Sequence, residues 1–308
     1  MILRFSKDLK EERIYANGVE LSSVMGMDTD KFGHRIYSHP ENKELYVASI
    51  KNPVLVTDVY RIAEFNPTLR DTVFKLYESP VRKTEYDGVS VNFEQGKYKG
   101  AWGPSIDTLL FCRALKSFKK TALKGKEIVE IGAGSGFISK YLLEKFPGIK
   151  LITLVDLNPH AIQSCKDNIK DRRAKFICGD ALKNKKKYDV LICNPPYIPR
   201  PKSIDDNAYE GTGLLGYLIV HAKDILKPGG SFITNISSLC EKEINEVIKK
   251  SGAKLRKIDK MIVPLKVCNV LNNKKWMEYL RKQGIKKEYR NGYEYFQTIT
   301  IVEIKPKF

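Results

Sequence analysis

The tetrapeptide Asn194-Pro195-Pro196-Tyr197 carries the sharpest chemical signal in this chain, and it directly follows an apolar run that predicts a strand at Asp189 to Cys193. The side-chain oxygen of Asn194 and the backbone carbonyl of Pro195 can each accept one N–H bond from a planar nitrogen. The two prolines fix the backbone φ angle and lack N–H donors, so the turn presents these acceptors rigidly. Tyr197 offers an aromatic face on which a planar group can stack. The turn therefore suits an acceptor whose reacting atom is an amide or exocyclic amine nitrogen.

A glycine loop precedes this turn in the chain. The strand pattern at Glu127 to Ile131 runs into Gly132-Ala133-Gly134-Ser135-Gly136, and a helix pattern follows. Glycines at alternate positions let the backbone turn tightly and approach a ligand closely. Ligands of open α/β sheets bind at this carboxyl end of the strands. Phe137 stands one position after the third glycine, where the dinucleotide-binding spacing Gly-x-Gly-x-x-Gly requires its last glycine, so a nicotinamide dehydrogenase is a remote alternative.

Two aspartates end the strands predicted next. Asp156 closes the apolar run that begins at Leu151, and Asp180 closes the run from Lys175, in the segment Cys178-Gly179-Asp180-Ala181. A carboxylate at the end of the second strand can accept hydrogen bonds from both ribose hydroxyls of a nucleoside cofactor. Strand-end aspartates also serve as helix caps. Their order behind the glycine loop favours the cofactor site.

Together these motifs resemble those of class I methyltransferases that depend on S-adenosyl-L-methionine. The tetrapeptide is similar to that of the HemK/PrmC-like glutamine methyltransferases and of many nucleobase amino methyltransferases. The resemblance covers about residues 99–250. It implies the cofactor S-adenosyl-L-methionine, no metal, and catalysis by Asn194, Pro195, Pro196 and Tyr197. The cofactor-binding residues that it implies are Glu130, Gly132, Gly134, Gly136, Asp156, Asp180, Ala181 and Asn194, with Asp107 and Thr108 from a HemK-like segment at Gly103 to Leu110.

Three functions stay open on these residues. The HemK-like motif implies N-methylation of a protein glutamine, whereas the same motif with a basic chain also fits methylation of an adenine or guanine amine in RNA or DNA. A non-catalytic cofactor- or RNA-binding module is disfavoured by the intact Asn194 and Tyr197. Thr212 stands where release-factor enzymes carry Asp, and residues 1–98 look mixed where theirs are helical. The expected partner is therefore a protein substrate or a nucleic acid, and the oligomeric state is not predicted.

The charge of the chain is strongly basic and uneven. Its 308 residues hold 54 Lys and Arg against 36 Asp and Glu, a formal net charge of +18. Such an excess suggests an anionic partner. Residues 1–98 sum to about −1, while 99–250 carry +10 and 251–308 carry +9. Lysine runs such as Lys183 to Lys187 and Lys286-Lys287 are more often solvated surface than phosphate sites.

Composition also excludes several classes of protein. No apolar run approaches the roughly 18 residues of a membrane span, and the segment Met1 to Lys7 does not read as a signal peptide. The six cysteines form no Cys-x-x-Cys pair, so they indicate neither a zinc site nor a redox motif. Several of them lie in apolar strand patterns, as core residues do. We expect reduced thiols in a cytoplasmic protein without a membrane partner.

The order of elements predicts an α/β fold with a doubly wound, mostly parallel, Rossmann-like sheet over residues 99–308 and a smaller α+β region at 1–98. The region at 1–98 is a candidate for substrate recognition. Asn17-Gly18 and Asp87-Gly88 indicate hairpins, and residues 68–78 a helix. Ser105 and Asn158 are expected to cap helices. The basic segment 251–308 predicts a helix around Trp276, as a core residue, and a hairpin that supplies an antiparallel edge strand.

Overall fold

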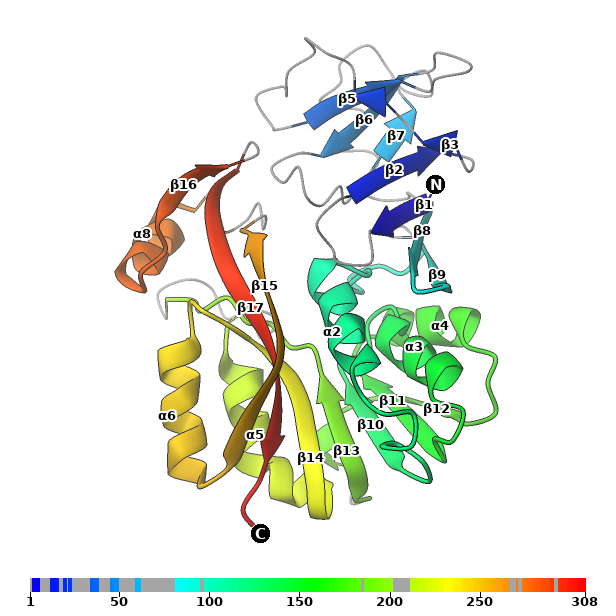
Figure 1. The fold of residues 1–308 in the computed structure, drawn as a ribbon, viewed down its shortest axis with the longest axis vertical. Coiled ribbons are helices and arrows are strands. Elements are labelled where there is room, and N and C mark those ends of the chain that lie inside the picture. Colours follow the sequence, from blue (N-terminus) through cyan, green and yellow to red (C-terminus); the bar gives the residue numbers. More distant parts are fainter. Residues whose placement is uncertain are drawn as a thin grey trace.

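The fold was obtained as a computed structural model (Figure 1). It describes residues 81–94, 97–183, 186–201, 211–265, 270, 273–290 and 293–308, together with strand segments at 2–5, 12–16, 19–20, 22–23, 34–38, 45–49 and 59–61. The predicted helix at 68–78 and Cys268 lie outside these residues. Within them, no helix combines the length and the apolar character that a bilayer span requires.

The centre of the molecule is one large sheet. Its path runs β12-β11-β10-β13-β14-β17-β15, and the neighbours from β12 to β14 are all parallel. β17 is antiparallel to both of its neighbours. The strands are β10 (Glu127–Ile131), β11 (Leu151–Asp156), β12 (Ala174–Cys178), β13 (Tyr188–Cys193), β14 (Leu226–Ser237), β15 (Lys254–Pro264) and β17 (Tyr293–Lys305). The predicted doubly wound, mostly parallel sheet is confirmed.

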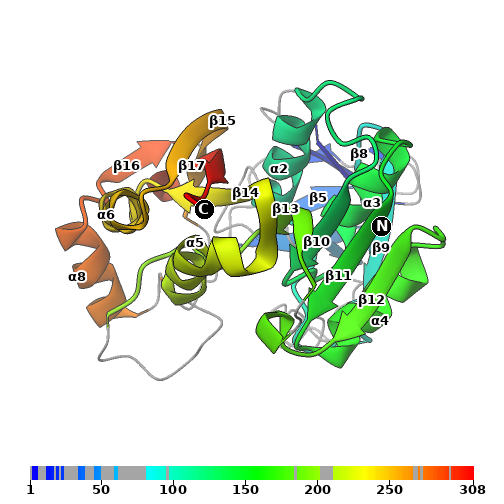
Figure 2. The same ribbon diagram turned by 90° about the horizontal axis from the view of Figure 1, so that it is seen from below.

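Helices cover both faces of this sheet (Figure 2). Alternate residues of a strand point to opposite faces. Ile128 on β10 accordingly joins the buried cluster beneath α2 and α3, whereas its neighbour Val129 joins the cluster beneath α5 and α6. The helices are α2 (Ile106–Lys116), α3 (Phe137–Lys145), α4 (Pro159–Asn168), α5 (Gly213–Ile225) and α6 (Glu241–Ser251). Burial on both faces explains why these strands read as continuous apolar runs.

The two predicted helix caps fix where α2 and α4 begin. The Asn158 side-chain oxygen accepts a hydrogen bond from the His160 backbone N–H at 2.9 Å, and Pro159 occupies the first helical position. At α2, Ser105 is the N-cap residue, and its backbone N–H donates to the Thr108 hydroxyl at 3.2 Å. A satisfied cap sets the start of a helix within one residue. The cap of α2 therefore places Asp107 and Thr108 in the first turn.

The C-terminal strand arrangement differs from the prediction. β16 (Lys287–Arg290) pairs antiparallel with β17, as the hairpin required, but β17 lies inside the sheet between β14 and β15. β15 forms the edge, and its frequent charged residues do not indicate a strand in the sequence. Lys254, Lys257 and Lys260 on β15 are exposed. Charged side chains are common on edge strands because they discourage pairing with other chains, and here they hide the apolar alternation.

The N-terminal part forms two further sheets, of strand orders β3-β2-β1-β8-β9 and β4-β5-β6-β7. Asp87 and Gly88, with φ of 51° and 77°, form the predicted turn between β8 and β9. The Lys140 ammonium on α3 donates to the Ser90 carbonyl on β9 at 2.6 Å, so this hairpin also contacts the main domain. The strands are β1 (Ile2–Phe5), β2 (Glu12–Ala16), β3 (Val19–Glu20), β4 (Ser22–Ser23), β5 (His34–Ser38), β6 (Leu45–Ser49), β7 (Val59–Arg61), β8 (Val81–Tyr86) and β9 (Val89–Glu94). The pairing of β2 with β3 agrees with the hairpin predicted at Asn17-Gly18.

Candidate active site

The predicted chemical motifs meet at the carboxyl edge of the main sheet. The glycine loop (residues 132–136) leaves β10, and the NPPY turn (residues 194–197) leaves its neighbour β13, with Ile131 opposite Cys193. β11 and β12 are the next two strands of the sheet; β11 ends at Asp156, and β12 ends two residues before Asp180. Because the carboxyl ends of adjacent parallel strands share one edge, four separate stretches of sequence line one site.

Each glycine of the loop adopts a backbone that L-residues avoid, with φ of 71°, 52° and 78° at Gly132, Gly134 and Gly136. A Cβ at Gly134 would lie 3.0 Å from the Trp102 carbonyl oxygen, and one at Gly136 would lie 3.0 Å from the Cys165 sulfur. These two glycines therefore allow close packing of the chain itself. A Cβ at Gly132 would meet no atom within 4 Å. Gly132 faces open space, as the backbone of a ligand cradle should.

The two strand-end aspartates both hold backbone N–H groups. Asp156 accepts hydrogen bonds from Gly134 N–H and from Asn158 N–H, each at 2.9 Å. Asp180 accepts from Leu182 N–H at 2.9 Å and so caps the short turn Ala181–Lys183. A carboxylate oxygen has a second lone pair. The capping role and the predicted cofactor role are therefore compatible, and Asp156 links the loop of β10 to the end of β11.

Three exposed apolar side chains near this edge were not predicted as site residues. Leu157 is 61 % exposed and Leu182 41 % exposed, and each lies within two residues of a strand-end aspartate. Trp102 is 65 % exposed, and its carbonyl lies against the glycine loop. Apolar surface held in water favours a ligand that covers it. The available sequence signal was an apolar residue placed just after the acid at a strand end, as with Leu157. The exposed side chains of Leu157, Leu182 and Trp102, together with the free space at Gly132, suit the binding of a nucleoside cofactor.

Glu130, predicted to bind the cofactor, has a buried carboxyl. The Ser139 hydroxyl on α3 donates to Glu130, which is 2 % exposed. Burial, with a smaller contribution from the Asp156 carboxylate, raises the pKa of Glu130 to about 8. The carboxyl is therefore mostly protonated at neutral pH, and its contact with a cofactor stays a prediction.

The catalytic candidate Asn194 is held from both sides. Its Nδ2 donates to Asp107 Oδ2 at 2.9 Å, and its Oδ1 accepts a hydrogen bond from Asn235 Nδ2. Asn235 is fully buried on β14, next to the end of β13. Asp107 also accepts from the Ser105 hydroxyl. One hydrogen-bond acceptor, Asp107, and one donor, Asn235, therefore fix the orientation of the Asn194 carboxamide. Asn235 belongs to no motif, so no sequence pattern indicated its role.

The remaining predicted residues have structural contacts as well. Asp107 contacts the NPPY turn through Asn194, and the Thr108 hydroxyl takes part in the cap of α2, so a cofactor contact of either stays a prediction. Tyr197 is half-buried and packs against the cluster beneath α2 and α3. Burial, and then the Asp107 carboxylate, hold the pKa of Tyr197 well above its ordinary value. The phenol is therefore neutral and suited to stacking.

Comparison with known proteins agrees with this geometry. The methyltransferase small domain family matches residues 108–260. A putative protein N5-glutamine methyltransferase of Methanocaldococcus jannaschii is 31 % identical over an alignment of 201 residues, which covers 61 % of this chain and 96 % of that protein. This chain belongs to the HemK-like methyltransferases. A release factor glutamine methyltransferase of Koribacter versatilis is 26 % identical over 40 % of this chain and 50 % of its own length. Methyltransferase HEMK2 of Homo sapiens is 26 % identical over 51 % of this chain and 82 % of its own.

Membership of the HemK-like family makes the chain a methyltransferase that depends on S-adenosylmethionine. One departure noted in the sequence has a structural counterpart. The Thr212 hydroxyl, at the position where release-factor enzymes carry Asp, donates to the Glu243 carboxylate at 3.0 Å. The preceding residues 202–210 lie outside the described part of the chain. In this HemK-like methyltransferase Thr212 therefore joins the start of α5 to α6.

Proposed function

We propose that this protein methylates the side-chain amide nitrogen of a glutamine in a protein, with a peptide-chain release factor as the substrate. Relatives named for this activity, the M. jannaschii and K. versatilis proteins, support the substrate class. The observation that carries the proposal is the fixed carboxamide of Asn194. It lies at the carboxyl edge of the sheet, one strand from the open side of the glycine loop.

An amide nitrogen is a poor nucleophile because its lone pair is delocalised, so its orientation matters more than its deprotonation. Asn194 Oδ1 keeps one lone pair beside its bond from Asn235. That lone pair and the Pro195 carbonyl would accept the two N–H bonds of the glutamine amide. The nitrogen then faces the cofactor in one geometry, and the Tyr197 ring offers a surface for the planar amide. Asp107 and Asn235 keep this arrangement from rotating.

S-adenosylmethionine supplies an electrophilic methyl group on a sulfonium when it is bound. Gly132 would leave room for it, and the free lone pairs of Asp156 would accept its ribose hydroxyls. Asp180 and the neighbouring Leu182 would bind the base. No residue needs to act as a strong base, since an amide nitrogen that has accepted a methyl group loses its proton readily to water. The neutral Tyr197 fits that requirement.

Methyl labelling of a cell lysate tests the proposal. The purified protein is incubated with lysate and tritiated S-adenosylmethionine, and the products are divided between nuclease and protease digestion. Label that protease releases and nuclease leaves supports a protein acceptor, and mass spectrometry of the release factor then locates the methylated glutamine. Label that only nuclease releases would replace the proposal with the nucleobase alternative. Asn194→Ala is the control, which should bind the cofactor and transfer no methyl group.

A further inference from the structure

The C-terminal module, defined as α8 (Lys274–Lys282) and β16 (Lys287–Arg290), stands beside the catalytic edge. It connects the end of β15 to the start of β17. β15 runs parallel to β14 because both are antiparallel to β17, so the module projects from the edge that holds the NPPY turn (Figure 1). The match to the methyltransferase small domain ends at residue 260. The module is thus an addition to that domain.

Specific contacts fix the module to the chain just behind the NPPY turn. The Trp276 indole N–H on α8 donates to the Pro199 carbonyl at 2.8 Å. The Arg200 guanidinium lies 5.5 Å from the centre of the Trp276 ring. Ile198 packs against the buried cluster that Trp276 shares with Met277, Leu280 and other residues of the module. Because Pro199 is two residues from Tyr197, these contacts connect the module directly to the NPPY turn.

The outer face of the module is basic. Four exposed lysines form this face, Lys274, Lys275 and Lys282 on α8 and Lys286 in the link to β16, and Lys287 at the start of β16 is exposed as well. Among the described residues, no ion pair involves any of these four lysines, and Glu278 and Glu288 are the acids on the same two elements. Trp276 is 2 % exposed, Tyr295 is 6 % exposed, and Tyr279 is half-buried against the same cluster, so these rings offer little face for stacking unpaired bases. Free ammonium groups beside aromatic rings that are mostly buried, as in the described part of the module, suit carboxylates better than single-stranded nucleic acid.

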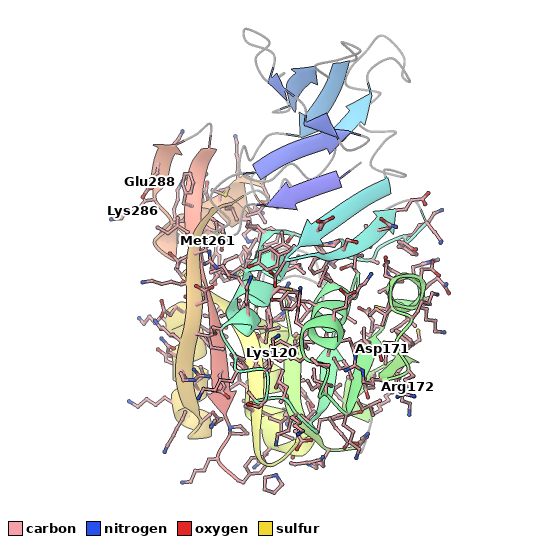
Figure 3. The ribbon with its side chains drawn as sticks, turned by 45° about the vertical axis from the view of Figure 1, so that its right-hand side comes forward. Lys120, Asp171, Arg172, Met261, Lys286 and Glu288 are labelled. Atoms are coloured by element: carbon pink, nitrogen blue, oxygen red, sulfur yellow. The ribbon has the colours of Figure 1, made fainter. Side chains whose placement is uncertain are left out.

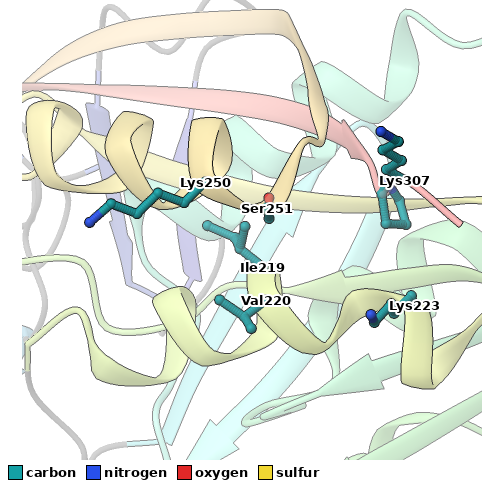
Figure 4. A pocket seen from close by; sticks show the side chains of 7 residues that line it. Ile219, Val220, Lys223, Lys250, Ser251 and Lys307 are labelled. Carbon is teal, nitrogen blue, oxygen red and sulfur yellow. The ribbon is translucent and has the colours of Figure 1, made fainter.

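Several lysines in the described part of the chain lie at the other end of the sheet, away from the site. A pocket at the other end of the sheet is lined by Lys223, Lys250 and Lys307. Figure 4 shows the three ammonium groups well separated from one another. Lys119, Lys120 and Lys124 precede β10 at that same far end, and Figure 3 shows Lys120 well apart from Lys286. These distant lysines offer a matched set for comparison.

We propose that the basic face of the C-terminal module docks an acidic surface of the acceptor protein and thereby delivers its glutamine to the NPPY turn. The proposal rests on the function proposed above. Charge complementarity of this kind raises the association rate and fixes orientation. Because Trp276 is hydrogen-bonded to Pro199, an acceptor protein bound to the module would also be positioned relative to Asn194.

The test compares two variants that each lose four positive charges. The module variant carries Lys274→Gln, Lys275→Gln, Lys282→Gln and Lys286→Gln, and the control variant carries Lys119→Gln, Lys120→Gln, Lys124→Gln and Lys250→Gln. Steady-state methylation is measured with the intact release factor of the same organism and with a short peptide that surrounds its methylated glutamine. We expect KM for the intact protein to rise about tenfold in the module variant alone, with kcat unchanged. KM for the peptide should not change in either variant.

Each other outcome has a distinct meaning. Equal KM values for the intact protein in the parent and both variants would overturn the docking proposal and leave the methylation proposal standing. Methylation of neither probe by the parent protein would overturn the proposed function itself. An unchanged KM for the release factor, together with module-dependent binding of a labelled RNA duplex in fluorescence anisotropy, would assign the surface to nucleic acid instead. Unchanged cofactor affinity in both variants confirms that the fold is retained.

Discussion

Replacement of Asn235 by aspartate tests how Asn194, the proposed catalytic residue, is oriented. Asn235 Nδ2 donates to Asn194 Oδ1, and Asn235 Oδ1 has no hydrogen-bond partner among the described residues, so Asn235→Asp removes one donated bond and little else. An ionised carboxylate only accepts hydrogen bonds, and Asp107 already accepts from the other end of Asn194. The oxygen of Asn194 must then face a carboxylate, which costs about 1–3 kcal/mol.

The kinetic consequence follows from that misorientation. A reactant misplaced by about 1 Å loses roughly 100-fold in rate, so we expect kcat of Asn235→Asp to fall by about that factor near pH 8. The affinity for S-adenosylmethionine, measured by calorimetry, should not change, because Asn235 lies away from the glycine loop contacts. Asn92→Asp makes the same chemical change at an exposed position on β9 and should leave kcat as it is.

The pH dependence separates orientation from general damage to the fold. Burial and the Asp107 carboxylate beyond Asn194 would raise the pKa of the introduced carboxyl. Its protonated form carries an O–H that can donate to Asn194 as the original amide did. The kcat of Asn235→Asp relative to the parent should therefore recover as the pH falls through that pKa. A ratio that stays constant between about pH 5.5 and pH 8.5, or a parental kcat throughout, would refute the orienting role.

Three other changes test separate parts of the site. Asp156→Ala should weaken S-adenosylmethionine binding about 10–100-fold in calorimetry, because it removes the carboxylate that accepts hydrogen bonds from Gly134 N–H and Asn158 N–H. Undiminished affinity would contradict the assignment of Asp156 to the ribose. The pKa of Glu130 is raised from 4.5 to about 8, so the free energy of unfolding should fall as the pH rises from about 4.5 through about 8, by on the order of a few kcal/mol. Glu130→Gln should abolish this dependence in denaturant titrations at several pH values, and a pH slope like the parent's would exclude Glu130 as its source. Trp276→Phe removes the N–H donated to Pro199 and should lower the free energy of unfolding by about 1–2 kcal/mol and reduce kcat; a loss of stability with parental kcat would show that the link does not position the turn.

The parts of the site that the sequence predicted are those whose geometry depends on residues close together in the chain. The glycine loop follows its own strand directly, and the left-handed φ of Gly134 and Gly136 is required by packing that only glycine tolerates. Asn158 caps a helix two residues after Asp156, which is again local. The exception among local patterns is β15, because its lysines and arginine face solvent at a sheet edge and obscure the period of two.

The parts that escaped prediction depend on partners far away in the chain. Asn235 reaches Asn194 across 41 residues, and Trp276 reaches Pro199 across 77. No sequence pattern around a single asparagine in an apolar strand indicates which residue it will bond. The place of β17 between β14 and β15 is likewise a matter of pairing between strands, which the order along the chain does not fix.

The sequence by itself determined the strand–loop motifs of this protein and the kind of ligand each can hold, since backbone turns, caps and acceptor groups are set by neighbouring residues. Only the tertiary structure decided how those motifs act together. The parallel sheet brings four strand ends to one edge, and hydrogen bonds with Asn235 on β14 and Asp107 on α2 leave the Asn194 amide a single orientation. The physical reason is that a buried polar group must find its hydrogen-bond partners within the fold, and those partners come from distant segments.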